Sequence, residues 1–272
     1  MTCRLIVNAD DYGRTAEVCQ GIRDAHLSGI VTSTTAMMNL PGVEEELGLA
    51  AQRTPDLGLG VHLVLTSGKP VLPLERIRSL VDSDGRFLRP NAFVGRLAFI
   101  DPAEARLEWR AQIEKFKHAA GHEPTHLDSH HHSSYFSEAL FRVMLELAAD
   151  YGVPIRMPLA MHAAADFPDE LIGSIQAFIP ELVDEFQPIM PEHFISAFYD
   201  GGATKPDLLA MIDTLPEGTT EIMTHPGRCT DELLRLSTYA RQREVELEIL
   251  TDPEVVGLVR HKRIERISFA GL

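Results

Sequence analysis

The sequence predicts an α/β fold, with residues 1–272 forming a single-domain, TIM-like (β/α) barrel of seven or eight strands. Short β-rich runs alternate with helical patterns almost from end to end, which is typical of βα units around a parallel sheet. Roughly eight such repeats favour a barrel over a doubly wound sheet, and a seven-stranded or irregular barrel stays open. The length of 272 residues also fits one α/β barrel.

The candidate strands are short runs rich in apolar and β-branched residues. In chain order they are Arg4–Ala9, Ile30–Met38, Leu57–Leu65, Thr125–His130, Pro154–Met157, Phe194–Phe198, Thr219–Met223 and Glu246–Leu250. The clearest helix begins at an Asp101 N-cap followed by Pro102 and stops at Gly121. Glu104 stands in the capping-box position of this helix. Residues 66–100 contain no clear strand, so we expect a surface excursion that forms a lid or a dimer contact.

Composition and charge exclude several classes of function. The chain has 44% hydrophobic and 24% charged residues, enough to bury a large core. Its 25 Lys and Arg against 40 Asp and Glu give a net charge of −15, which would repel nucleic acid and anionic membrane surfaces. The sequence shows no signal peptide, no run of about 20 apolar residues, and three scattered cysteines. We therefore expect a cytoplasmic protein without nucleic-acid or membrane partners.

Polar side chains stand at the carboxyl ends of four predicted strands, where parallel α/β folds place their chemistry. They are Asn8, Asp10 and Asp11 after the first strand, His62 in the third, His130–His132 after the fourth and His225 after the seventh. Each has a structural alternative, because an aspartate pair before a glycine can cap a turn and a strand histidine can be a core residue. Burial alone does not explain such groups at four matching ends, so together they indicate a functional site.

Spacing in the fourth strand narrows the choice of metal ligand. At about 3.3 Å per residue, His126, Asp128 and His130 share one face, but the outer two lie roughly 13 Å apart and cannot bind one ion. His130 at the strand end is the better ligand, and we expect His126 in the core or behind the ligands. If the strand stops there, His132 lines the pocket and His131 points away.

One imidazole from each of two strands and one carboxylate from the first strand make a two-His, one-Asp set. Such a set leaves coordination positions open, as catalytic metal sites do. The remaining aspartate of the pair is then free to act as general base, and His225 to protonate a leaving group.

Seven motifs run through the chain in the order LIVNADDYG, GIVTSTTAMMN, GLGVHLVLTSGKPV, PTHLDSHHH, ISAFYD, MTHPG and LEILTDPEV. In order and spacing, over nearly the whole chain, they resemble the YdjC-like carbohydrate deacetylases, and most closely the chitooligosaccharide (chitin disaccharide) deacetylases among them. The resemblance implies a distorted (β/α) barrel, a homodimer and one divalent metal ion. It also implies hydrolysis of the N-acetyl group of an N-acetylglucosamine-containing oligosaccharide, such as diacetylchitobiose or its phosphate.

The resemblance further implies roles for single residues: Asp11, His62 and His130 bind the metal, Asp10 is the base and His225 is the acid. Magnesium is typically assigned in the family, although two imidazoles with one carboxylate suit zinc at least as well by ligand softness. The aspartate in SAFYDGG and the SSYF after the fourth-strand histidines depart from the family pattern. Both departures concern the saccharide rather than the metal ligands.

A sugar pocket needs polar groups and flat apolar faces. The candidate substrate contacts are Tyr12, Asn39, Asp128, His132, Tyr135, Phe136, Arg156, Phe198 and Tyr199. Each aromatic residue in this set is equally well explained as part of the core. Two other functions are open: a metal-dependent phosphoesterase, which would need more carboxylates or a basic clamp, and a non-catalytic sugar-binding protein, which would need no spare carboxylate and no acid histidine.

Overall fold

The computed structural model describes residues 3–157 and 169–272. Its centre is a seven-stranded sheet in the order β4-β3-β2-β1-β6-β5, with β7 beside the amino-terminal half of β1. All of these pairings are parallel. The strands are β1 (Cys3–Tyr12), β2 (Ser33–Ala36), β3 (Gly58–Leu63), β4 (Leu127–Ser129), β5 (His193–Ile195), β6 (Gly218–Thr224) and β7 (Glu265–Arg266).

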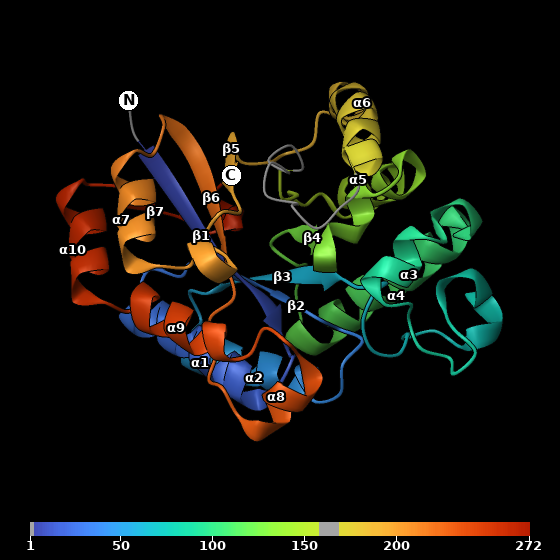
Figure 1. Ribbon diagram of the computed structural model, residues 1–272, viewed down its shortest axis with the longest axis horizontal. Coiled ribbons are helices and arrows are strands. Elements are labelled where there is room, and N and C mark those ends of the chain that lie inside the picture. Colours follow the sequence, from blue (N-terminus) through green and yellow to red (C-terminus); the bar gives the residue numbers. More distant parts are fainter. Residues whose placement is uncertain (1–2, 158–168) are drawn as a thin grey trace.

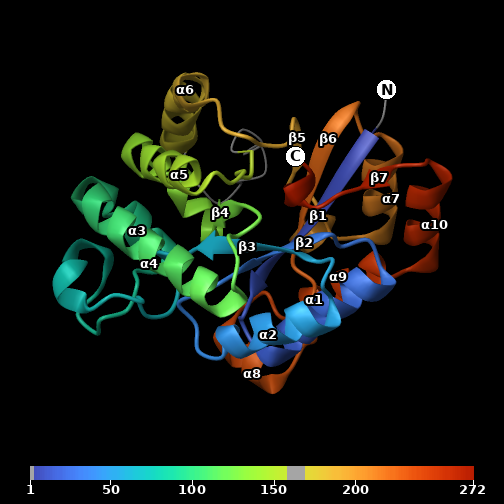
Figure 2. The ribbon, with the colours of Figure 1, turned by 180° about the vertical axis from the view of Figure 1, so that it is seen from behind.

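Helices surround this sheet (Figures 1 and 2). In the described residues they are α1 (Ala16–Ser28), α2 (Val43–Arg53), α3 (Pro90–Val94), α4 (Pro102–Ala120), α5 (Glu138–Tyr151), α6 (Asp169–Phe186), α7 (Lys205–Asp213), α8 (Asp231–Leu236), α9 (Arg241–Leu250) and α10 (Pro253–His261). Neighbouring helices pack together in a series, α10 on α7, α9 on α1, α1 on α2, α2 on α4 and α4 on α5. The carboxyl ends of the strands are therefore left as the place where loops can form a pocket.

The sheet curls into a half-barrel, so the predicted distorted barrel of seven or eight strands is confirmed. Next to the edge strand β4, the predicted strand Pro154–Met157 makes only an isolated parallel bridge, between Leu127 and Ile155. Two further backbone hydrogen bonds keep this segment beside β4, from Leu127 N to Pro154 O and from Arg156 N to Leu127 O. The segment thus places Arg156 inside the half-barrel without forming a regular strand.

One predicted strand is wrong. Residues 246–250 belong to helix α9, whose buried side chains are Arg243, Glu246, Ile249 and Leu250. These four residues are three, three and one positions apart, so they lie along one face of a helix. Two of the four are charged, and the pattern of apolar residues alone therefore did not predict the helix. Apart from Pro154–Met157, the other six predicted strands lie at β1 to β6, with ends shifted by up to three residues. The two-residue β7 is too short for its sequence pattern to predict it.

Helix α4 begins and ends as predicted. Asp101 Oδ1 accepts a hydrogen bond from Ala103 N at 2.8 Å, and Gly121 closes the helix with a φ of 78°. The predicted capping box is wrong, because the Glu104 carboxylate accepts hydrogen bonds from the backbone and hydroxyl of Ser79, both at 2.7 Å. Glu104 thus fastens the excursion to α4 instead of capping the helix.

The excursion, residues 66–100, lies against α4 and contains α3 with short 3-10 turns. The buried Glu108 carboxylate accepts hydrogen bonds from Val71 N at 2.9 Å and Leu72 N at 3.0 Å. The buried Gln112 amide donates to Val64 O and accepts from Val64 N, both at 2.9 Å. One face of α4 therefore fixes the path of the chain as it leaves β3.

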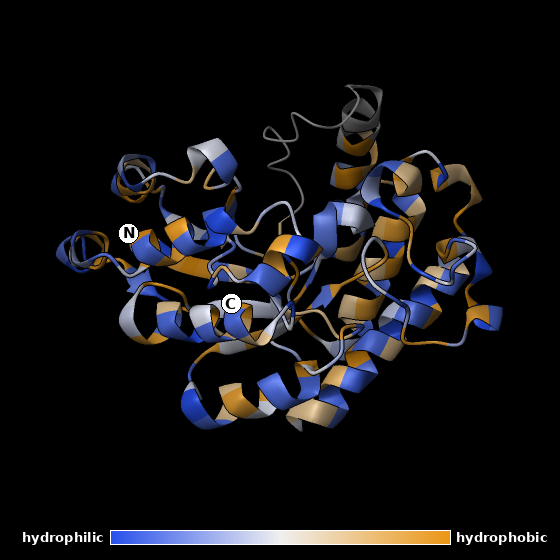
Figure 3. Cartoon of the chain, turned by 60° about the horizontal axis from the view of Figure 1, so that its bottom comes forward, coloured by the Kyte–Doolittle hydropathy of each residue, from blue (hydrophilic) through white to orange (hydrophobic). Residues whose placement is uncertain are grey.

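A single hydrophobic core fills the space between the sheet and the helices. Strand β1 is buried from Leu5 to Tyr12, and the helices carry both hydrophobic and hydrophilic residues (Figure 3). In the described part of the chain, no helix has the length and apolar character needed to cross a membrane.

Candidate active site

The two neighbouring aspartates lie at the end of β1, where the strand is irregular. The register between β1 and β2 shifts between Ala9 and Tyr12, and Asp11 has a φ of 72°. Successive residues of a regular strand point to opposite faces, so Asp10 and Asp11 would separate. The bulge turns Asp11, and both carboxylates line the same cavity.

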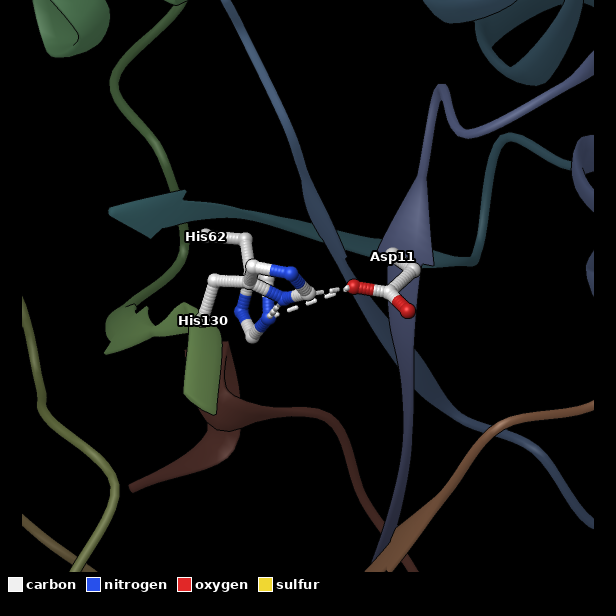
Figure 4. Close-up of side chains that lie close together, drawn as sticks. All are labelled: Asp11, His62 and His130. Carbon is white, nitrogen blue, oxygen red and sulfur yellow. Dashed lines mark hydrogen bonds and ion pairs between the residues drawn. The ribbon is translucent and has the colours of Figure 1, made fainter. Parts of the chain in front are cut away.

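Three ligand atoms from β1, β3 and the end of β4 meet at this point (Figure 4). His130 Nδ1 lies 3.0 Å from Asp11 Oδ1 and 3.2 Å from His62 Nε2, and His62 Nε2 lies 3.5 Å from Asp11 Oδ1. Atoms bound at about 2.1 Å to one cation stand about 3.0 Å apart at right angles and about 3.4 Å apart at the tetrahedral angle. All three residues are buried, and Asp11 Oδ1 accepts no hydrogen bond from the described residues. The donor set therefore fits a divalent cation.

Groups behind the ligand atoms orient them. His62 Nδ1 lies 2.6 Å from Asp128 Oδ1, which leaves Nε2 free to face the other two ligand atoms. Arg243 pairs with Asp11 Oδ2, the carboxylate oxygen outside the ligand triangle. Burial alone would raise the pKa of Asp11, but His130 and Arg243 outweigh it and hold the pKa well below its usual range. Asp11 is therefore ionised, as a metal ligand must be.

Asp10 is held by Arg156 through both carboxylate oxygens. The guanidinium donates to Oδ1 at 2.6 Å and to Oδ2 at 2.8 Å, and Asn8 Nδ2 donates to Oδ1 at 2.8 Å. Arg156 also pairs with Glu221 at 2.8 Å and Asp128 at 3.0 Å, so one buried cation faces three buried carboxylates. Burial raises the pKa of Glu221 to about 8, whereas Asp10, despite its burial, has a lowered pKa because Arg156 stabilises its charge.

His225 follows β6 and lies beside Asp10, with 3.9 Å between its Nε2 and Asp10 Oδ2. Burial lowers the pKa of His225 to about 4, so the imidazole is neutral at pH 7. Its backbone N–H donates to the Glu246 carboxylate, which also accepts a hydrogen bond from the Tyr239 hydroxyl. Burial raises the pKa of Glu246 to about 7.

A cavity of about 450 Å³ opens in front of these groups, which is within the size range of small-molecule sites. Its aromatic wall consists of His131, His132, Tyr135, Phe194, Tyr199 and Tyr239. Tyr199 is 44% exposed, and its ring stacks on that of Tyr239 at 4.5 Å between centroids. The same Tyr199 ring lies 5.3 Å from the ring of His225. A flat aromatic face is thus available beside the proposed acid.

Among the predicted substrate contacts, His132, Tyr135 and Tyr199 line the cavity. The prediction that His131 points away is wrong, because His131 lines the same cavity and its Nδ1 lies 3.0 Å from Thr66 Oγ1. The cause is the backbone after β4: His131 and His132 have φ values of 54° and 55°, so the alternation of a strand no longer applies.

Six predicted substrate contacts do not line the cavity: Tyr12, Asn39, Asp128, Phe136, Arg156 and Phe198. The three aromatic rings are buried in the core. The Asn39 amide instead donates to two backbone carbonyls of the loop after β3. Asp128 and Arg156 are fully buried and contact His62 and Asp10, so they act behind the residues that face the cavity.

Sequence reasoning placed His126 correctly, since it is buried and stacks on Phe269 at 3.7 Å between centroids. It missed Arg243, Glu246 and Tyr239. The signal was present, because Arg243 and Glu246 are three residues apart on one helix face, but residues 246–250 were predicted as a strand and Arg243 was left outside it.

The half-barrel, with two imidazoles and two carboxylates at the ends of its strands, defines an α/β protein with a candidate hydrolytic site. The sequence pattern of the YdjC-like protein family matches residues 4–261, so the chain belongs to this family.

Similar proteins carry related names. A carbohydrate deacetylase of Thermoanaerobacter pseudethanolicus is 38% identical over 260 residues, covering 96% of this chain and 95% of the relative. A chitooligosaccharide deacetylase of Proteus mirabilis is 35% identical over 252 residues, covering 91% and 90%. A crystal structure of an Enterococcus faecalis protein, described as a cellobiose-phosphate cleavage protein, matches with a TM-score of 0.86 and 33% identity over 100% of this chain and 99% of that chain. A family 4 carbohydrate esterase of Streptomyces lividans, at a TM-score of 0.51 and 10% identity over 97% and 91%, shows the same fold alone.

Proposed function

We propose that this chain is a metal-dependent carbohydrate deacetylase that removes the N-acetyl group of a chitooligosaccharide and releases acetate. The observation that carries the proposal is the triangle of Asp11, His62 and His130 atoms next to a second, Arg-held carboxylate, Asp10. A ligand set with open positions and an adjacent base suits metal-dependent hydrolysis of an amide. The deacetylase names of the relatives support the same activity.

The divalent cation held by the three ligands would polarise the acetyl carbonyl and stabilise the charge that develops on its oxygen. Asp10 takes a proton from the attacking water. Its two hydrogen bonds to Arg156 fix the carboxylate plane, so a reaction geometry is set before substrate enters. The water oxygen bonds to the carbonyl carbon.

His225 protonates the departing nitrogen. Because its pKa of about 4 leaves it neutral at pH 7, it must first receive the proton that it donates. Asp10, 3.9 Å away, is the nearest acid once it has taken the proton of the water. The proton thus passes from water through Asp10 and His225 to the amine as the C–N bond breaks, and the products are acetate and a free amino sugar.

The sugar lies along the aromatic wall. Tyr199 presents an exposed ring beside His225, and pyranose rings pack well on flat apolar faces. We infer an N-acetylglucosamine oligosaccharide such as diacetylchitobiose, or its phosphate, because the Proteus mirabilis relative is named a chitooligosaccharide deacetylase and the Enterococcus faecalis structure is described by a disaccharide phosphate.

The phosphoesterase alternative is disfavoured by Arg156. Asp10, His62 and Asp128 form a second group of close ligand atoms that a two-metal phosphoesterase would use. The Arg156 guanidinium already pairs with both of these carboxylates, so a cation stands where a second metal ion would be needed.

The test is acetate release from N,N′-diacetylchitobiose, with and without chelator. We expect Asp10→Asn to abolish turnover and keep its metal, and Asp11→Asn to lose the metal. Asp84→Asn, on an exposed turn of the excursion, serves as a matched control with wild-type activity and metal content. Reconstitution with Mg²⁺ or Zn²⁺ identifies the active ion. Acetate release that survives removal of the metal would contradict the proposal, and binding of the sugar without turnover would favour a sugar-binding protein.

A further inference from the structure

Arg243 pairs with a proposed metal ligand, yet the mechanism above gives it no role. We propose that Arg243 is a positioning residue, which holds Asp11 as a ligand through one oxygen and ties that ligand to the loop that carries His225. This inference rests on the proposed function, since it assumes that Asp11 binds the cation.

The Arg243 side chain contacts three different segments. It is 2% exposed and comes from α9. Its Nη2 pairs with Asp11 Oδ2, its Nε donates to Tyr239 O at 3.0 Å, and its Nη1 lies 3.5 Å from His225 O. A planar guanidinium with several N–H donors can make these contacts together, whereas a lysine ammonium cannot reproduce the fork.

The main chain of Arg243 supports the same loop. Its carbonyl accepts a hydrogen bond from Gly227 N at 3.0 Å. Two contacts of Arg243, one from its side chain to His225 O and one from its carbonyl to Gly227 N, therefore hold both ends of the segment 225–227 after β6. A shift of Arg243 would move the metal ligand and the acid histidine together.

The contact with Asp11 decides which oxygen faces the cation. Asp11 lies on a bulge, and a free carboxylate there could turn either oxygen, or both, toward the two imidazoles. The ion pair with Arg243 occupies Oδ2 and leaves Oδ1 in the triangle with His62 and His130. Groups behind metal ligands act in this way, and their loss typically costs about 10- to 100-fold in metal affinity or activity.

A positioning role and a purely electrostatic role of Arg243 predict opposite effects of Arg243→Met on metal affinity. If Arg243 mattered only as a positive charge near the cation, Arg243→Met would remove a repulsion and tighten metal binding, and Arg243→Lys would bind as the wild type does. If Arg243 positions Asp11, both variants weaken metal binding, because neither side chain has the several N–H donors of the guanidinium.

The experiment is a titration of chelator-treated protein with Co²⁺, followed by the visible absorption of the bound ion, which reports its coordination. We expect Arg243→Met and Arg243→Lys to lower Co²⁺ affinity by about 10- to 100-fold and to change the spectrum. At saturating cation, kcat for diacetylchitobiose falls while KM stays near its wild-type value, because His225 is displaced.

Arg23→Met is the matched control. Arg23 is 3% exposed and pairs with Glu46 and the Tyr12 hydroxyl, so its loss leaves a half-buried carboxylate without its cation. We expect a loss of stability in urea with unchanged Co²⁺ affinity.

Two results would overturn the inference: an Arg243→Met protein that binds Co²⁺ as tightly as the wild type or tighter, or an equal loss of affinity in Arg23→Met, which would mean a general effect of destabilisation. Failure of the proposed function is distinguishable, because the wild type would then bind Co²⁺ and release no acetate.

Discussion

At the scale of single residues, one backbone angle decides whether the two aspartates share a site. The left-handed φ of Asp11 is rare outside glycine, although aspartate tolerates it better than most residues. Such a conformation costs of the order of 1–3 kcal/mol and persists where surrounding contacts fix it. Here the Arg14 N–H donates to Asp11 O at 3.0 Å, and Arg243 holds the side chain. Local strain thus brings a second carboxylate to the position where Asp10 already lies.

A pH-dependent stability is expected from Glu246. Burial raises its pKa to about 7, so the folded protein keeps a proton that the unfolded chain releases above about pH 4.5. The wild type therefore loses stability through this group as pH rises from about 4.5 through 7. The difference in unfolding free energy between Glu246→Gln and wild type should shift in favour of the variant between pH 5 and pH 8, measured by urea unfolding.

Glu248→Gln, an exposed change on the same helix, should show no such trend. A Glu246→Gln difference that is the same at both pH values would contradict this account.

The residues of the proposed ligand triangle could be found from the sequence, but the residues behind them could not. In the sequence, the end of a strand is the place where polar residues interrupt an apolar run. This pattern singled out His62, His130 and the aspartate pair. Polarity does not tell whether a side chain faces a cavity or another side chain. Asp128 and Arg156 were for that reason expected to contact sugar, and they contact His62 and Asp10 instead.

At the scale of elements, close approach of β3 and β4 depends on Gly60. A Cβ at this position would lie 2.5 Å from the His126 ring and 2.8 Å from its carbonyl oxygen. The ring cannot easily give way, because it stacks on Phe269. The position of His62, two residues further along β3, therefore depends on a residue without a side chain.

Gly60→Ala is expected to lower the unfolding free energy by about 1–3 kcal/mol, the usual effect of overpacking, and to weaken metal binding through His62. Gly48→Ala is the control, since Gly48 is exposed in the middle of α2 with nothing within 4 Å of its added Cβ. That change should stabilise the protein by roughly 0.5–1 kcal/mol. Urea unfolding measures both, and wild-type stability in Gly60→Ala would show that the strands can separate at no cost.

At the scale of the whole molecule, the half-barrel joins residues that are far apart in the chain. Three strands from its amino-terminal half supply the proposed ligand triangle, and β6 with α9 brings His225 and Arg243 from the other end. A ligand that binds only when these parts are assembled stabilises the whole fold.

Metal addition should therefore raise the melting temperature. At a free cation concentration of 100 times Kd, the gain is about 2.7 kcal/mol, or roughly 5–10 °C for a chain of this size. Differential scanning calorimetry with and without chelator measures the shift. Asp11→Asn should abolish it, and an equal shift in that variant would place the ion elsewhere.

Because the excursion is held by α4, one part of the cavity wall is built separately from the proposed ligand triangle. Glu104 and Glu108 hold the excursion from one face of α4, and Pro90 and Asn91 of the excursion form part of the cavity wall. The triangle of ligands uses none of these residues. Changes of sequence in residues 66–100 are therefore expected to alter the length or decoration of the saccharide that the cavity accepts, while the proposed ligand triangle keeps its place.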